Sequence, residues 1–130
     1  MDILRTYLTS LIVFLGIDAV WLGVVARNFY PKHIGHLMSD KPNLLVALVF
    51  YLIYIFGLVF LVLIPNRESG MTKTLLLAAL YGLCTYATYD LTNQATLKSW
   101  PPLVTVIDLI WGTALTTAVA GITLLILRKV

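Results

Sequence analysis

The chain has 130 residues, of which 60% are hydrophobic and 12% charged, and its formal net charge is +3. Soluble domains carry about 25% charged residues, so this composition excludes an ordinary soluble protein and predicts an integral membrane protein. The modest positive charge suits an anionic membrane surface and gives no reason to expect a nucleic-acid partner. We therefore expect membrane lipids to be its main surroundings.

Four apolar stretches follow one another along the chain, each bounded by charged residues or prolines. They cover residues 7–26, 44–64, 74–96 and 103–127. About 20 apolar residues suffice for a helix to cross the hydrocarbon core, where every backbone polar group must be paired. We predict an all-α polytopic membrane protein with four transmembrane helices in an antiparallel bundle, forming a single domain over residues 1–130.

The first span, 7–26, contains Asp18, and Trp21 follows it by one helical turn. An ionisable group at the bilayer centre costs roughly 2.5–3.5 kcal/mol on insertion scales. Such a residue is by default a functional-site hypothesis, although a purely structural polar network is the alternative. Because positions i and i+3 share a helical face, the indole is placed to shield or hydrogen-bond the carboxylate.

The connection 27–43 mixes basic residues, aromatic residues and two histidines. Phe29 and Tyr30 suit an interfacial aromatic belt. We interpret His33 and His36 as interfacial residues as well. The alternative is proton handling or ligation of a divalent metal, but a His-x-x-His spacing is a weak signal by itself. The second span, 44–64, has no ionisable residue, so we expect it to face lipid or a partner subunit in a homo-oligomer.

The third span, 74–96, carries Asp90 with Tyr86 and Asn93 on the same helical face, and Tyr89 extends its polar end. In the fourth span, 103–127, Asp108 is followed by Trp111 at the same spacing as in the first span. Small residues at four-residue steps allow close helix contact, so we expect the fourth span to be central.

Depth predicts that the three aspartates form one cluster. At about 1.5 Å per residue, Asp18 lies about 13 Å from the end of its span, Asp90 about 12 Å and Asp108 about 8 Å. All three ends adjoin either the 27–43 connection or the 97–102 turn, so the aspartates should lie in the same half of the membrane. The predicted ligand-binding residues are Asp18, Trp21, Tyr86, Tyr89, Asp90, Asn93, Asp108 and Trp111.

Two classes of function fit this cluster. The first, which we favour, is binding or transport of a cation or a lipophilic ligand at the intramembrane aspartates. The second is a membrane-embedded enzyme or accessory subunit in lipid modification, with the aspartates as acid and base or as metal ligands. No catalytic or cofactor motif decides between them. A weak excess of Lys and Arg on the side of the termini favours a cytoplasmic location for both ends.

Several motifs together resemble a known family. They are Asp18-Ala-Val-Trp21-Leu-Gly23, Asp40-Lys41-Pro42-Asn43, Tyr89-Asp90-Leu-Thr92-Asn93 and Asp108-Leu-Ile-Trp111-Gly112. In these positions the chain resembles the bacterial membrane family catalogued as domain of unknown function 2177, over nearly its whole length. The resemblance implies a four-helix bacterial inner-membrane protein without an assigned activity.

Overall fold

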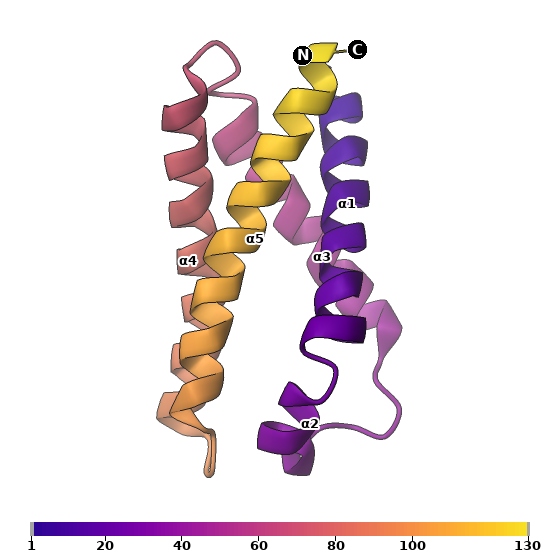
Figure 1. The fold of residues 1–130 in the computed structure, drawn as a ribbon, viewed down its shortest axis with the longest axis vertical. Coiled ribbons are helices and arrows are strands. Elements are labelled where there is room, and N and C mark those ends of the chain that lie inside the picture. Colours follow the sequence, from indigo (N-terminus) through magenta and orange to yellow (C-terminus); the bar gives the residue numbers. More distant parts are fainter. Residues whose placement is uncertain (1, 130) are drawn as a thin grey trace.

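The computed structural model describes residues 2–129, with side chains as far as Arg128. These residues form helices and no strands. The long helices are α1 (Ile3–Val20), α3 (Leu44–Leu58), α4 (Met71–Thr96) and α5 (Pro102–Lys129). The short segments are the π-helical η1 (Trp21–Val25) and η3 (Val59–Leu63), the α-helix α2 (Phe29–Ile34) and the 3-10 turn η2 (Gly35–Leu37). Both chain ends lie at one end of the molecule, here called the terminal end, and α2 lies at the other, the α2 end (Figure 1).

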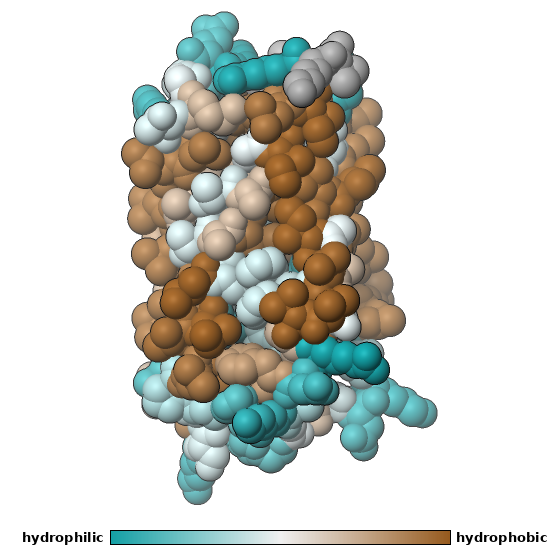
Figure 2. Space-filling view, viewed as in Figure 1, coloured by the Kyte–Doolittle hydropathy of each residue, from teal (hydrophilic) through white to brown (hydrophobic). Residues whose placement is uncertain are grey.

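Three helices within the described residues are long and apolar enough to cross a membrane: Ile3–Val25, Leu44–Leu63 and Pro102–Arg128. They match the predicted first, second and fourth spans within a few residues, and the all-α membrane class is confirmed. Helix α4 has 26 residues, enough to cross a bilayer, but it is more polar than the other three. Figure 2 shows an apolar flank between two hydrophilic ends, as expected for a protein surrounded by lipid.

Local capping explains where the helices begin. Asp2 Oδ1 accepts a hydrogen bond from the Leu4 amide at 3.0 Å, so α1 starts four residues before the predicted apolar span. Asn43 caps α3 in the same way through the Val46 amide at 3.2 Å. Side-chain oxygens at these positions satisfy amides that have no partner inside the helix. Ser99, in the turn between α4 and α5, has a φ of 60°, a left-handed conformation that lets the chain reverse within a few residues.

Helix α5 packs against both α4 and α1, which agrees with its predicted central position. It approaches α4 closely at Gly82 and Gly112. A Cβ added at Gly82 would overlap the Gly112 carbonyl oxygen and lie 2.6 Å from Thr116 Oγ1. Backbone contact of this kind requires glycine, and it fixes the depth of α4 relative to α5.

The second span was expected to face lipid or a partner subunit, and in addition to an exposed apolar face it has a buried one. One face of α3 and η3 lies in the core, where Tyr54, Ile55, Leu58 and Leu63 are buried against Phe14 of α1. The Tyr81 hydroxyl of α4 also donates to the Tyr54 carbonyl oxygen at 2.8 Å. A helix that is apolar on every face does not reveal from composition which face is buried, because lipid and core select the same residues.

Candidate functional site

A cavity of about 510 Å³ lies toward the α2 end and is lined by every helix from α1 to α5. It contains three carboxylates, no Lys or Arg among its lining residues, and mostly aromatic walls. The lining residues are Asp18, Trp21, Leu22, Tyr30, Ala47, Phe50, Tyr51, Thr85, Tyr86, Tyr89, Asp90, Asp108 and Trp111. This volume is typical of sites for small organic ligands.

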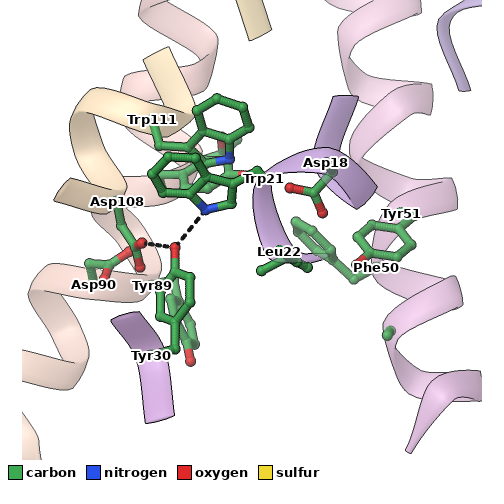
Figure 3. A pocket seen from close by; sticks show the side chains of 13 residues that line it. Asp18, Trp21, Leu22, Tyr30, Phe50, Tyr51, Tyr89, Asp90, Asp108 and Trp111 are labelled. Atoms are coloured by element: carbon green, nitrogen blue, oxygen red, sulfur yellow. Dashed lines mark hydrogen bonds between the residues drawn. The ribbon is translucent and has the colours of Figure 1, made fainter. Parts of the chain in front are cut away.

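A hydrogen-bond chain links three elements at the cavity (Figure 3). The Trp21 Nε1–H donates to the Tyr30 hydroxyl at 3.0 Å, and that hydroxyl donates to Asp108 Oδ1 at 2.6 Å. Trp21 begins the π-helical segment η1, in which the Ala26 amide reaches back to the Trp21 carbonyl oxygen at 2.7 Å. π-Helical turns are rare in proteins as a whole, and those that occur are often found at functional sites. The short helix α2 is thereby tied to α1 and α5 through Tyr30.

Asp90 is the unusual member of the site. Its side chain is 0% exposed, and among the described residues neither carboxyl oxygen has a hydrogen-bond partner. Its carboxyl group faces that of Asp108, which is already bonded to Tyr30 (Figure 3). Leaving a buried polar group unpaired costs about 1–3 kcal/mol, and more for a charged one. The site therefore carries unused capacity to bind a donor or a cation.

The two indoles stack on each other and divide the carboxylates. The rings of Trp21 and Trp111 have centroids 4.3 Å apart and an interplanar angle of 10°. Asp18 lies on one side of this pair, and Asp90 and Asp108 lie on the other (Figure 3). Trp111 Nε1 points toward Asp18 without forming a hydrogen bond with any described residue.

The stacking sets the relative depths of the aspartates, which the sequence placed in the same half of the membrane. Asp18 is one turn from Trp21 toward the terminal end, and Asp108 is one turn from Trp111 toward the α2 end. Three residues of helix rise on each side place Asp18 and Asp108 about 9 Å apart along the axis.

Three residues that line the cavity are also exposed on the outside of the molecule. They are Leu22 of η1, Phe50 of α3 and Tyr89 of α4, which are 47%, 47% and 58% exposed. Residues that both line a cavity and face outward mark its mouth. This mouth lies on the apolar flank rather than at a hydrophilic end, so a ligand dissolved in lipid has direct access to it.

All the predicted site residues except Asn93 line this cavity. Asn93 shares a face with Asp90, but it lies one turn nearer the α4–α5 turn, beyond the cavity. His33 Nδ1 lies 2.9 Å from the Phe29 carbonyl oxygen of its own helix, and His36 is exposed. Within the described residues no group of three or more His, Cys, Asp or Glu side chains is arranged to hold a metal ion.

Sequence reasoning missed the residues that α2 and α3 contribute: Tyr30, Ala47, Phe50 and Tyr51. Tyr30 was assigned to the interfacial belt, and nothing local links it to Asp108, which lies 78 positions further along the chain. Burial raises the pKa of the Tyr30 hydroxyl above its ordinary value, and the hydrogen bond to Asp108 raises it further. The hydroxyl therefore remains a donor at physiological pH.

Apolar helices around a buried carboxylate site define an integral membrane protein, the class that the composition predicts. A profile of the family described as "Predicted membrane protein (DUF2177)" matches residues 3–125. The chain belongs to this family, as its motifs suggested. No curated protein and no solved structure matches the chain.

Proposed function

We propose that this protein binds a lipophilic cation in the cavity between its helices. The observation that carries the proposal is Asp90, a fully buried carboxyl group that borders the cavity and faces Asp108, with no hydrogen-bond donor from the described residues beside either oxygen. If Asp90 served only the stability of the fold, we would expect a hydrogen-bond donor beside it, because a buried polar group without a partner lowers the free energy of unfolding. A cationic ligand supplies the missing partner.

The lining chemistry selects the class of ligand. Asp18, Asp90 and Asp108 are carboxylates with no lining Lys or Arg to neutralise them. The stacked indoles and the surrounding tyrosines present π-faces, which attract cations by about 0.5–2 kcal/mol each. Aromatic walls also favour an apolar body attached to the charge. An inorganic cation would leave most of this cavity unused.

Access through the membrane supports a lipophilic ligand rather than a water-soluble one. The exposed lining residues Leu22, Phe50 and Tyr89 place the mouth of the cavity on the apolar flank. Tyr30 closes the cavity toward the α2 end by bonding Trp21 and Asp108 together. A ligand that partitions into lipid would pass Phe50 and Tyr89, place its charge at Asp90 and Asp108, and lay its apolar groups against the indoles.

This proposal includes α4 as a fourth membrane-spanning helix and residues 1–130 as one multi-pass domain. Much of the polarity of α4 comes from threonines, and the hydroxyls in its second half are paired with carbonyl oxygens of the same helix. Thr85 donates to the Tyr81 carbonyl oxygen at 2.9 Å, Thr88 to Cys84 at 2.7 Å and Thr96 to Thr92 at 2.7 Å. Paired hydroxyls remove much of the cost of placing the helix in hydrocarbon.

For localisation we propose a bacterial cytoplasmic membrane with both termini cytoplasmic. The terminal end carries Arg5, Arg67, Lys73 and Arg128, and the α2 end carries Arg27, Lys32, Lys41 and Lys98. Lys129 adds to the terminal side in sequence, but its side chain lies outside the described residues.

Cysteine-accessibility labelling at Glu68→Cys and Asp40→Cys, with Cys84 replaced by Ala, tests the proposed orientation. Labelling of intact cells at position 40 alone is expected, and labelling at position 68 alone contradicts the orientation.

Two isosteric ions of opposite charge test the binding proposal. Purified protein in detergent would be titrated with radiolabelled tetraphenylphosphonium and, separately, with tetraphenylborate. We expect saturable binding of the cation and at least about 10-fold weaker binding of the anion, since one lost charge-assisted contact amounts to 1.4 kcal/mol or more. Asp90→Asn should bind the cation about 30-fold more weakly. Asp40→Asn changes an exposed carboxylate outside the cavity and should bind the cation as the wild type does. Equal binding of both ions, or unchanged binding in Asp90→Asn, would contradict the proposal.

The enzymatic alternative has one specific observation in its favour. Asp90 and Asp108 face each other beside a tyrosine that donates to Asp108, an arrangement able to move a proton. Incubation of the protein with membrane lipids, followed by mass spectrometry of the lipids, tests it. New lipid species that form with the wild type and not with Asp90→Asn would favour the enzyme over the binding protein.

A further inference from the structure

At the terminal end, away from the cavity, charged side chains from three separated parts of the chain surround a second pocket of about 300 Å³. Arg5 comes from the start of α1, Arg67 from the connection before α4 and Arg128 from the end of α5. Asp2 and Glu68 line the same pocket, together with Leu127. Figure 2 shows hydrophilic side chains gathered at this end, directly beside the apolar flank.

These charges remain available to a ligand. Among the described side chains here, no Arg lies within 4.0 Å of a carboxylate oxygen as an ion pair. Arg67 makes one weak contact, from Nη1 to the Ile64 carbonyl oxygen at 3.3 Å, and Asp2 uses Oδ1 to cap α1. Opposite charges that share a pocket without pairing leave both an anion-binding and a cation-binding group free.

We infer that this pocket holds the headgroup of a phospholipid that carries both a phosphate and a primary ammonium group, as in phosphatidylethanolamine. The guanidinium groups match the phosphate, which arginine binds through planar, paired hydrogen bonds. Glu68 and Asp2 match the ammonium group. Leu127 borders the pocket on α5, where the acyl chains would continue down the apolar flank.

Hydrogen bonding, rather than net charge, favours this zwitterion over an anionic lipid. The pocket has three arginines and two carboxylates, so a phosphate alone would balance its net charge, but only a headgroup with an ammonium group also donates hydrogen bonds to Glu68 and Asp2. A trimethylated headgroup would carry the same charge as the primary ammonium but could not donate hydrogen bonds to Glu68. The pocket thus distinguishes ethanolamine from both glycerol and choline headgroups. This inference does not rest on the ligand of the central cavity.

Native mass spectrometry of delipidated full-length protein tests the inference. The protein would be titrated with dioleoyl phosphatidylethanolamine, phosphatidylcholine and phosphatidylglycerol, which share acyl chains. We expect about 10-fold preference for the ethanolamine lipid over each of the others, the ratio that corresponds to one charge-assisted hydrogen bond. Equal retention of the three lipids would overturn the inference.

Single variants test the carboxylates and the arginines of this pocket separately. Glu68→Gln should abolish the preference for ethanolamine over choline while keeping total lipid retention, and Arg67→Gln should reduce retention of all three. Arg27→Gln, an exposed arginine at the α2 end, is the matched control and should change nothing. A Glu68→Gln protein that keeps the preference would refute the assignment, and so would an Arg27→Gln protein as impaired as Arg67→Gln. Water-soluble glycerophosphoethanolamine should not displace the lipid at equal concentration, and displacement would exclude a membrane lipid as the occupant.

Discussion

The two halves of the molecule differ in the kind of buried polar group that is left without a hydrogen-bond partner. In the half near the terminal end, Phe14, Leu58 and Leu63 form a dense core, and the unpartnered buried groups among the described residues there are neutral hydroxyls of Ser10 and Thr123. The half near the α2 end buries Asp90 with neither oxygen paired, beside a cavity. An orphaned carboxyl group costs far more than an orphaned hydroxyl. Under the proposed function, the terminal half provides stability and the α2 half gives up stability for a binding site.

The largest expected effect comes from breaking the packing between α4 and α5. Gly82→Val would drive side-chain atoms into the Gly112 carbonyl oxygen and Thr116, so we expect a loss of about 3 kcal/mol in the free energy of unfolding. Thermal unfolding in detergent, followed by circular dichroism, measures this. Gly16→Ala is the control, since a Cβ there meets no atom within 4 Å. Equal melting temperatures for Gly82→Val and the wild type would show that the helices are not in backbone contact.

Changing Asp90 should separate binding from stability. Asp90→Asn keeps the size of the side chain but removes its ability to carry a negative charge, and we expect about 30-fold weaker binding of tetraphenylphosphonium, equivalent to about 2 kcal/mol. Asp90→Leu should also lose binding yet unfold at a higher temperature, with a gain of about 1 kcal/mol from removing the unpaired carboxyl group. If Asp90→Leu instead unfolds the protein, the carboxyl group is structural and the contrast between the two halves fails.

Tyr30 is expected to matter less, because it bridges rather than contacts the charge of the ligand. Tyr30→Phe removes the hydroxyl between Trp21 and Asp108, which should cost about 1 kcal/mol of stability and weaken cation binding about fivefold. Titration calorimetry of both proteins measures the binding difference. A Tyr30→Phe protein that binds the cation as well as the wild type does would show that the bridge is dispensable.

The pH dependence of this bridge follows from its raised pKa. A pKa that is higher in the folded protein than in the unfolded chain favours the neutral hydroxyl when folded. Its contribution is therefore fully present below the ordinary tyrosine value of about 10 and is lost only as the pH rises toward the folded value. The stability difference between wild type and Tyr30→Phe should stay constant from pH 6 to about 9.5. A difference that declines within this range would contradict the assignment.

The smallest effects are expected at polar residues outside the cavity. Asn93→Ala and His36→Ala should change the affinity for tetraphenylphosphonium less than about twofold, because neither residue lines the cavity. Equilibrium dialysis at several cation concentrations is sufficient to resolve this. A loss comparable to that of Asp90→Asn in either variant would extend the site beyond the cavity described.

Much of this arrangement is predictable from the sequence, because carboxylates inside apolar spans are expensive and must face inward. That argument brings Asp18, Asp90 and Asp108 to one cavity without any structure. It does not predict the π-helical segment at Trp21 or the stacking of Trp21 on Trp111, which set the relative depth of the aspartates. Such details depend on how α1 and α5 are aligned along their length, and apolar sequence carries little information about that alignment.

The residues that α2 and α3 contribute to the cavity could not be predicted from the sequence, for a different reason. Tyr30 and Tyr51 are ordinary residues for an interface and for an apolar helix, so their types do not mark them as part of a site. Their roles follow from contacts between distant parts of the chain. The hydrogen bond from Tyr30 to Asp108 shows this most clearly, because α2 must fold back under the bundle to make it.

Anomalous diffraction from crystals soaked with tetraphenylarsonium tests the central claim most directly, because the arsenic atom marks where the charge of a lipophilic cation resides. The account predicts an anomalous peak inside the cavity, beside the carboxyl groups of Asp90 and Asp108 and against the stacked indoles of Trp21 and Trp111. The same soak of Asp90→Asn crystals should give no peak there. A peak outside the cavity in the wild type, or an undiminished peak in Asp90→Asn, would contradict the claim that the α2 half is built around a cation site at Asp90.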